Sequence, residues 1–304
     1  MTGLTNRIII LFVSISFTAQ TMALQRAMET ARPRSSRLFD DPLARGFLRG
    51  PLRAVADLAA LPVAGRTVAA LYDLIWPGPR PSAVARTRLI DDTLAGALAD
   101  GIAQVVLLGA GFDSRAWRLP AIRRARVIEV DRPETQRAKV AALRRTGQPL
   151  ERVRFTPVDF ERDDLAAAIR AAGLATDQPA VFVWEGVTNY LSAAAVDQTL
   201  SVVRALAAPG SLLLFTYVHQ GVIDGSAHFP EAARWVRSVA RAGEPWTFGF
   251  LPETLPGYLA ARGFTLSWAL STADAGRRYF GPAGRRDRAS ELYHVALAQV
   301  QCQS

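Results

Sequence analysis

The second half of the chain alternates short apolar runs with longer amphipathic segments. The apolar runs predict β-strands near residues 104–108, 126–130, 153–156, 180–184 and 211–217. The segments between them have helical periodicity and predict helices near residues 133–145, 162–172 and 193–207. Runs such as VVLL and LLLF have no polar alternate positions, which is typical of strands covered on both faces. The alternation therefore predicts a mainly parallel sheet between two layers of helices.

Two further apolar runs near the C-terminus predict additional strands. They are FTLSWAL at residues 264–270 and LYHVALAQV at residues 292–300. Together with the five earlier runs they predict a seven-stranded, mainly parallel sheet, which is an α/β fold. We expect residues 104–304 to form this core domain.

The stretch between the fifth strand and these last runs is mainly helical. Helices are predicted near residues 230–242 and 254–262, and the second ends at Gly263. Residues 220–250 interrupt the alternation of strands and helices. We interpret them as a C-terminal lid insert that helps to shape a substrate pocket.

Residues 14–103 precede the sheet and contain no predicted strand. Helical periodicity occurs in Ala54–Leu61 and in Thr67–Leu74. The prolines of Trp76–Ser82 are predicted to interrupt the helices, because proline has no N–H to donate and its ring clashes with the preceding turn. Another helix is predicted over residues 83–101, ended by a glycine. We therefore expect an N-terminal helical cap.

The first residues allow two interpretations. Arg7 precedes the apolar run IIILFVSISFTA, and Ala19 and Ala23 offer small residues at which a signal peptidase could cut. The run is too short to span a bilayer comfortably. The interpretation that we favour is an amphipathic helix beginning at Ser16, with residues 1–13 as an apolar extension. We then expect a cytoplasmic protein, and export or membrane association is the alternative.

Composition excludes several classes of protein. Of the 304 residues, 50% are hydrophobic and 21% are charged, which indicates a globular chain rather than a disordered one. The net charge of +9 comes almost wholly from dispersed arginines, because Lys139 is the one lysine, and this dispersion is evidence against a nucleic-acid surface. Cys302 is the one cysteine and the three histidines are not spaced as ligands. We therefore expect neither a disulfide framework nor a metal site.

Glycines and an acid stand at the ends of the first two predicted strands. The segment QVVLLGAGFDSR, Gln104–Arg115, ends its apolar run in a turn with Gly109 and Gly111. The next apolar run ends in Asp131, twenty residues beyond Gly111. A glycine turn lets the backbone approach a ligand, and an acid at the next strand end accepts hydrogen bonds from ribose hydroxyls. The spacing predicts a nucleoside-containing ligand.

The third glycine of a dinucleotide fingerprint is missing from this turn. Ser114 takes its place, and Asp113 puts a carboxylate where a pyrophosphate would rest on a helix N-terminus. A ligand with a sulfonium and an amino-acid end, such as S-adenosylmethionine, tolerates that carboxylate. We therefore favour this ligand, and a Rossmann-type nucleotide-binding protein without methyltransferase activity is the alternative.

Two more strand ends carry side chains suited to the rest of such a ligand. Asp159 and Phe160 follow the third strand and offer a carboxylate for an adenine amino group beside an apolar side chain for the ring. Glu185 directly follows AVFVW, and we interpret it as an unpaired carboxylate without a role in the core. Because the carboxyl ends of parallel strands share one edge of the sheet, we expect all four strand ends to gather there.

Several segments match a known family. They are RLFDDPLA (Arg37–Ala44), ARTRLIDD (Ala85–Asp92), QVVLLGAGFDSRAWRL (Gln104–Leu119), VIEVDRPETQRAK (Val127–Lys139), VDF (Val158–Phe160), WEGVTNYL (Trp184–Leu191) and GEPWTFGF (Gly243–Phe250). In these segments the chain resembles the leucine carboxyl methyltransferase family, and closely its bacterial branch of S-adenosyl-L-methionine-dependent methyltransferases. The resemblance covers nearly the whole chain from about Ser16. It implies a Rossmann-like class I methyltransferase fold with S-adenosyl-L-methionine as cofactor.

The resemblance also implies a set of cofactor-binding residues. They are Arg86, Gly109, Ala110, Gly111, Asp131, Asp159, Phe160 and Glu185. The arginine would pair with the methionyl carboxylate of the cofactor, and Glu185 would hold its ammonium group. The glycine turn would lie beneath the methionine part. Asp131 would bind the ribose, while Asp159 and Phe160 would frame the adenine.

Methyl transfer from a sulfonium chiefly requires in-line alignment of the acceptor and exclusion of water. A carboxylate acceptor would need no general base, whereas a hydroxyl would need one. His219 and Tyr190 are the nearest candidates, and we assign neither. We expect O-methylation of a carboxylate or hydroxyl on a small-molecule acceptor such as a secondary metabolite. The alternatives are a protein C-terminal carboxyl group and a tRNA.

The lid insert carries several aromatic side chains. They are His228, Trp235, Trp246 and Phe248. These side chains could line an apolar acceptor pocket or pack beneath the lid, and we favour packing. Beyond the acceptor we expect no membrane or metal partner, and the sequence does not indicate the oligomeric state.

Overall fold

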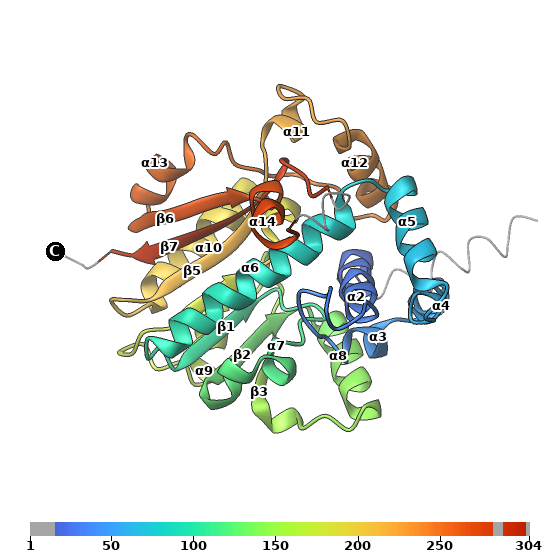
Figure 1. Cartoon of the computed structure of the whole chain (residues 1–304). Helices are drawn as coiled ribbons and strands as arrows, with labels where there is room; N and C mark the ends of the chain where they lie inside the picture. Colours follow the sequence, from blue (N-terminus) through green and yellow to red (C-terminus); the bar gives the residue numbers. More distant parts are fainter. Residues whose placement is uncertain (1–15, 282–287, 302–304) are drawn as a thin grey trace, which may run out of the picture.

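The computed structural model describes residues 16–281 and 288–301. The expected apolar extension, residues 1–13, lies outside the described residues, as does Cys302. Within the described ranges, no helix has the length and hydropathy needed to cross a membrane. Figure 1 shows a central sheet with helices on both faces and the N-terminal helices gathered beside it.

The sheet has seven strands in the order β3-β2-β1-β4-β5-β7-β6. Their bounds are β1 Gln104–Leu108, β2 Arg126–Asp131, β3 Val153–Pro157, β4 Val181–Trp184, β5 Leu212–Val218, β6 Phe264–Ser271 and β7 Tyr293–Val300. Strand β7 is antiparallel to both of its neighbours, β5 and β6, and the other neighbouring pairs are parallel. The prediction of a seven-stranded, mainly parallel sheet is confirmed.

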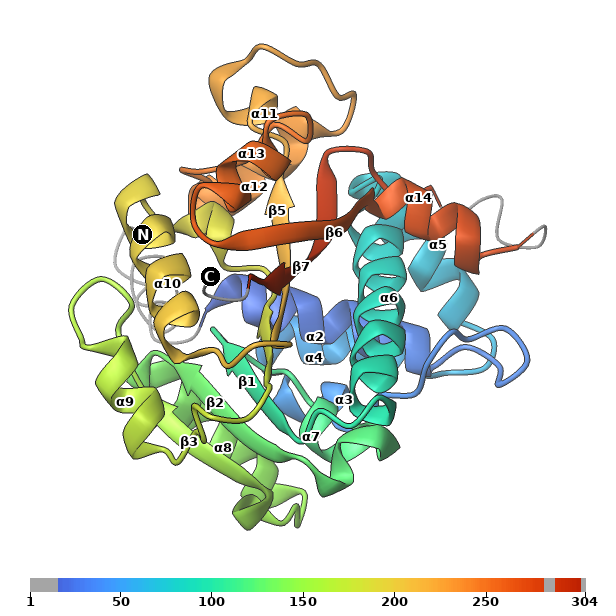
Figure 2. The ribbon, with the colours of Figure 1, turned by 90° about the vertical axis from the view of Figure 1, so that its left-hand side faces the viewer.

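Alternate residues of the strands face different layers of helices. In β1, Val105 and Leu107 belong to one apolar cluster, whereas Val106 and Leu108 belong to another. The first cluster includes side chains of α6 (Pro79–Ala99) and α14 (Thr272–Tyr279), and the second includes those of α9 (Leu165–Ala171), α10 (Ala193–Leu206) and α13 (Leu255–Ala260). Figure 2 shows α6 on one side of the sheet and α9 and α10 on the other. This double cover explains the continuous apolar runs.

The strand order brings the predicted strand ends together. Strands β3, β2, β1 and β4 are consecutive neighbours, so the residues that follow them lie along one edge. The chain crosses from β1 outward to β2 and β3 and then returns to β4 on the other side of β1. Such a reversal opens a crevice at the carboxyl ends of the two central strands, where ligands bind in open α/β sheets.

The N-terminal helices form a separate apolar cluster beside the sheet. They are α2 (Phe17–Thr30), α3 (Ala44–Phe47), α4 (Gly50–Ala59) and α5 (Gly65–Ile75). Ser16 caps α2, because its hydroxyl accepts a hydrogen bond from the Ala19 N–H, and this confirms the helix that we favoured. Leu24 and Phe47 pack with Phe112, which follows β1, and with Leu143 of α8 (Pro133–Arg145). The cap and the core are therefore joined by a shared interior.

The predicted interruption at Trp76–Ser82 is present but shorter than expected, and the predicted start of the next helix at residue 83 is wrong. Helix α6 begins at Pro79, and the interruption is confined to the three residues between α5 and α6. Pro79 and Pro81 stand in the first turn, where the missing N–H would have no intrahelical partner. These two prolines therefore lie within the first turn of α6 and do not precede the helix.

The lid insert contains α11 (Gly221–Asp224) and α12 (Ala232–Arg241). Trp235 of α12 is buried, and its indole N–H donates a hydrogen bond of 3.0 Å to the Pro77 carbonyl oxygen. For this tryptophan the structure agrees with packing beneath the lid. Helix α14 was missed because TADAGRRY is short, contains a glycine and has few large apolar side chains. Its sequence signal is the capping box of Ser271 with Asp274.

Candidate active site

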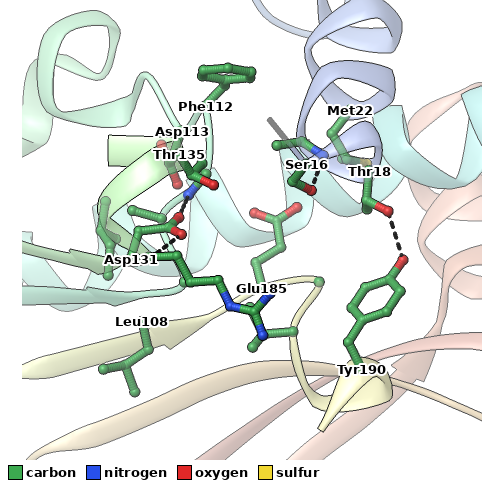
Figure 3. Close-up of a pocket in the computed structure, with 18 of the residues that line it drawn as sticks. Ser16, Thr18, Met22, Leu108, Phe112, Asp113, Asp131, Thr135, Glu185 and Tyr190 are labelled. Carbon is green, nitrogen blue, oxygen red and sulfur yellow. Dashed lines mark hydrogen bonds between the residues drawn. The ribbon is translucent and has the colours of Figure 1, made fainter. Parts of the chain in front are cut away.

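A cavity of about 320 Å³ opens at the carboxyl ends of the central strands. It is lined by the turns after β1, β2 and β4, by α2, and by residues 243–247 of the lid insert. Figure 3 shows Asp131 and Asp113 on one side, Thr18 and Tyr190 on the opposite side, and Glu185 between them. We call the part with Asp131, Asp113 and Glu185 the donor side and the part with Thr18 and Tyr190 the acceptor side, as labels for the roles that we propose for them. Its volume falls within the range of small-molecule sites.

The glycine turn after β1 requires its glycines. Gly109 and Gly111 have φ angles of +68° and +48°, which disfavour any residue with a side chain. A Cβ on Gly109 would lie 2.3 Å from Cγ2 of Val187. The Gly109 and Ala110 N–H groups both donate to the Val130 carbonyl oxygen, which anchors the turn to β2. At Gly109 and Gly111, therefore, no side chain covers the backbone that lines the cavity.

Asp131 ends β2 and points back at the glycine turn. Its carboxylate accepts hydrogen bonds from the N–H of Gly111 and, at 2.6 Å, from the N–H of Arg132. Burial raises the pKa of Asp131, and the two N–H donors oppose this shift. The side chain lines the cavity with its orientation fixed by the backbone.

Phe160 and Asp159 have different surroundings although they are adjacent in sequence. Phe160 is buried and lines the cavity. Asp159 does not line it, because its carboxylate accepts the Glu161 N–H at 3.1 Å and caps the turn that leads to α9. A contact between Asp159 and a cofactor therefore stays a prediction from the resemblance.

Glu185 is not the unpaired carboxylate that the sequence suggested. Its two oxygens accept hydrogen bonds from Nε of Arg86 at 2.9 Å and from Nη1 of Arg115 at 2.8 Å. Burial alone would raise the pKa of Glu185, but Arg115 and Arg86 outweigh it and hold the pKa below its ordinary value. Both arginines come from segments far away in sequence, so the pairing could not be read from the local pattern. The correction gives the cavity an ionised carboxylate held by two cations.

Arg86 reaches the cavity from the N-terminal half of α6. Besides Glu185, its guanidinium lies 2.8 Å from Sδ of Met22 and stacks over the Tyr293 ring at 4.6 Å from the ring centre. The side chain is buried and lines the cavity. It therefore presents a positive charge to the cavity, fixed in place by its contacts with Glu185 and Tyr293.

A buried network of ion pairs lies beneath the donor side and was missed at the sequence level. Arg115 contacts Asp91 at 2.7 Å, and it also pairs with Asp113 and Glu185. Arg118 extends the network through Asp91 at 2.6 Å. Burial alone would raise the pKa of Asp113, but Arg115 and other nearby cations lower it to about 2. All these residues lie in three segments that match the family, Ala85–Asp92, Gln104–Leu119 and Trp184–Leu191, and that coincidence was the available signal.

The acceptor side is built from three separate chain segments. Thr18 lies in the first turn of α2, Tyr190 ends the 3₁₀ helix η3 (Thr188–Tyr190), and Glu244 belongs to the lid insert. The Thr18 hydroxyl lies 3.1 Å from the Tyr190 hydroxyl and donates to Oε2 of Glu244, which also accepts the Thr18 N–H at 2.9 Å. Thr18 and Glu244 were not singled out in the sequence.

The two base candidates from the sequence occupy different places. Tyr190 lines the cavity, and burial raises its pKa, so it stays a phenol at neutral pH. His219 does not line the cavity; its Nδ1 accepts the Gly221 N–H at 3.0 Å and its ring packs edge-on against Phe229. Among the residues that the structure describes, no group of three or more histidine, cysteine or acidic side chains could hold a metal ion.

Comparisons with known proteins agree with this geometry. Residues 19–204 match the family model described as leucine carboxyl methyltransferase. A provisionally named S-adenosyl-L-methionine-dependent methyltransferase of Frankia alni is 38% identical over 76% of this chain and 80% of its own length. A relative of Mycobacterium tuberculosis with the same provisional name is 33% identical over 83% of this chain and 81% of its own length. The chain belongs to the leucine carboxyl methyltransferase family.

The chain is thus an S-adenosyl-L-methionine-dependent methyltransferase with S-adenosyl-L-methionine as its cofactor. Its fold also matches a solved structure. A provisionally named methyltransferase from Thermobifida fusca superposes with a TM-score of 0.57 over 91% of this chain and 94% of its own, at 20% identity. This likeness supports the Rossmann-like class I fold that the resemblance implied.

The donor-side residues of the methyltransferase have the chemistry that this cofactor requires. The cofactor has a ribose diol, a carboxylate and an ammonium group. The carboxylate of Asp131 is suited to the diol, the guanidinium of Arg86 to the carboxylate and the carboxylate of Glu185 to the ammonium group. The positive φ angles at Gly109 and Gly111 keep the floor of the cavity free of side chains. The residues present therefore fit the cofactor.

Proposed function

We propose that the methyltransferase transfers the methyl group to an oxygen atom of a small-molecule acceptor. One observation carries the proposal: the cavity continues past the donor side to a small polar acceptor side formed by Thr18, Tyr190 and Glu244. The cofactor supplies an activated methyl group on a sulfonium when it is bound. The chain then has to hold the acceptor oxygen in line with that methyl group and to keep water out.

The donor side would hold the cofactor through the residues implied by the family resemblance. Arg86 would bind the methionyl carboxylate, and Glu185, kept ionised by Arg115, would bind the ammonium group. The backbone of Gly109, Ala110 and Gly111 would lie against the methionine part. Asp131 would accept hydrogen bonds from the ribose, and Phe160 would cover the adenine. Asp159 would reach the adenine only if its turn rearranged, since its carboxylate now caps that turn.

The lid insert and α2 would close the acceptor side. Glu244 of the insert binds the N-terminal turn of α2 through the Thr18 N–H and hydroxyl. This contact places both segments beside the same space. A cavity of about 320 Å³ suits a small molecule better than a folded macromolecule.

The test is to follow the label from methyl-labelled S-adenosyl-L-methionine into an extract of the organism that encodes the chain. We expect the label in the small-molecule fraction. Label in acid-precipitated protein would indicate a protein carboxyl acceptor, and label in ribonuclease-sensitive material would indicate an RNA acceptor. Either result would replace the proposed acceptor class and leave the methyltransferase assignment in place.

A further inference from the structure

The charged side chains of the cavity are distributed unevenly between its two sides. On the donor side, Arg26, Arg115 and Arg118 are each paired with a buried carboxylate, and Arg86 is paired with Glu185. On the acceptor side, Glu244 is the charged group among the described residues that line the cavity, beside the hydroxyls of Thr18 and Tyr190. Among the described lining residues, the cations are these four arginines and Arg132, which follows Asp131. On the acceptor side a carboxylate acceptor would therefore meet the carboxylate of Glu244.

Hydrogen bonding fixes the orientation of Glu244. Because the single hydroxyl proton of Thr18 is donated to Glu244, the Tyr190 hydroxyl must donate its proton to Thr18. The chain of donors runs from Tyr190 through Thr18 to Oε2 of Glu244. Its other oxygen, Oε1, accepts no hydrogen bond from any residue that the structure describes. Glu244 thus keeps one oxygen available to a group in the cavity.

Building on the proposed function, we propose that the acceptor is an alcohol or a phenol and that Glu244 takes up its proton. The acceptor oxygen forms a bond to the methyl carbon while the bond from that carbon to the sulfonium breaks, and the bonding pair stays on the sulfur. The acceptor proton passes to the Glu244 carboxylate and later to solvent. The products are a methyl ether, S-adenosylhomocysteine and one proton, so atoms and charge balance.

Tyr190 and Thr18 are positioning residues in this scheme. Burial raises the pKa of Tyr190, so its hydroxyl remains protonated and serves as a donor. Thr18 connects it to Glu244 across two chain segments. A carboxylate with a free oxygen and a fixed orientation at the wall of the cavity is suited to general-base catalysis.

The first experiment distinguishes the two acceptor classes with the wild-type chain. After incubation of the cell extract with methyl-labelled cofactor, the small-molecule fraction is treated with mild alkali. We expect label that survives the treatment, because ethers are stable where methyl esters release labelled methanol. Release of the label as methanol would overturn the inference and keep the proposed function. Absence of label from every small molecule would contradict both the inference and the proposed function.

The second experiment tests Glu244 itself on the labelled product found in this way. Glu244→Gln is expected to lower kcat about 100-fold or more at neutral pH. It should bind S-adenosylhomocysteine within about twofold of wild type, because Glu244 is not among the residues proposed to hold the cofactor. Raising the pH should restore its rate as the acceptor hydroxyl ionises. If Glu244 only held the lid insert against α2, the rate of the Glu244→Gln variant would not recover at high pH.

The matched control is Glu253→Gln, the same change at an exposed acid nine residues further along the chain and outside the cavity lining. It should keep the wild-type rate and pH profile. A Glu244→Gln variant with the wild-type rate, or with a rate deficit that does not change with pH, would overturn the role of Glu244. If that variant fails to fold, the alkali test on the wild-type chain still decides the acceptor class.

Discussion

The donor and acceptor sides of the cavity are built from different kinds of contact. The donor side rests on parallel strand ends and on side chains that are almost fully buried, such as Arg115 and Glu129. The acceptor side rests on hydroxyl groups and on a half-exposed carboxylate, Glu244, contributed by an N-terminal helix and a lid insert. We infer that substitutions on the donor side cost the fold more stability than substitutions on the acceptor side.

The largest expected effect comes from breaking an ion pair under the donor side. Lys139 lies 2.6 Å from Glu129, both side chains are 1% exposed, and burial raises the pKa of Glu129 to about 7. Lys139→Met should lower the free energy of unfolding by about 3–5 kcal/mol, because it leaves a buried carboxylate without its cation. Urea denaturation measures this.

The same measurement on the acceptor side sharpens the contrast. Thr18→Val removes a partly buried hydroxyl and should cost about 1 kcal/mol. The double variant Lys139→Met, Glu129→Leu should recover much of the lost stability, since it removes the stranded carboxylate as well. Equal losses for Lys139→Met and Thr18→Val would contradict the difference between the two sides.

The next effect concerns the glycine turn. Gly109→Ala should cost about 1–2 kcal/mol for the left-handed backbone and about 1–3 kcal/mol more for the clash with Val187. Gly147 is the matched control, because it has nearly the same φ angle, +67° against +68°, with nothing within 4 Å of a Cβ. Gly147→Ala should show the backbone cost alone. Thermal and urea unfolding of both variants would reveal whether the clash matters.

A third prediction separates Asp131 from Asp159 in cofactor binding. Asp131→Ala should weaken the binding of S-adenosylhomocysteine by about 2–4 kcal/mol, because hydrogen bonds to a charged acceptor in a buried site are lost. Asp159→Ala should change it by less than about 0.5 kcal/mol, since this side chain caps its own turn outside the cavity. Isothermal titration decides. Comparable losses for both would restore the adenine role that the resemblance gives to Asp159.

A further expected effect is a dependence of stability on pH. The folded state lowers the pKa of Asp113 to about 2 from an ordinary value of 3.8, so its stabilising contribution is present above about pH 4 and is lost as the pH falls toward 2. At pH 6, Asp113→Asn should be less stable than wild type by about 2 kcal/mol. The difference should shrink between pH 4 and 2 in acid titrations followed by circular dichroism. A difference that stays constant over that range would show that the carboxylate charge is not responsible.

The strands and the glycine turn were predictable because their signals are local. An apolar run, a glycine at a positive φ angle and an acid at a strand end are all encoded within a few residues, and the structure has each of them where the sequence placed it. The start of α6 was misplaced because proline has opposite effects in the first turn of a helix and in its interior. Only the position of the preceding helix end resolves that ambiguity.

The ion pairs of Glu185 could not be predicted, because they join residues that are far apart along the chain. Its partners Arg86 and Arg115 lie 99 and 70 residues away along the chain, and no periodicity relates them. Asp159 differs, because its contact is local. Its position after a strand predicted a ligand contact, but its carboxylate accepts a hydrogen bond from the nearby Glu161 N–H. Both outcomes depend on which donors come within reach after packing.

The sequence by itself determined the α/β fold and the floor of the cavity, because these follow from short-range patterns of apolar residues and glycines. The cofactor was implied by segments of the sequence that resemble the family. Only the tertiary structure decided what surrounds the acceptor. Thr18 meets Tyr190 and Glu244 across 172 and 226 residues, respectively. Such contacts depend on how α2 and the lid insert pack against the rest of the fold, and no local sequence pattern predicts that packing.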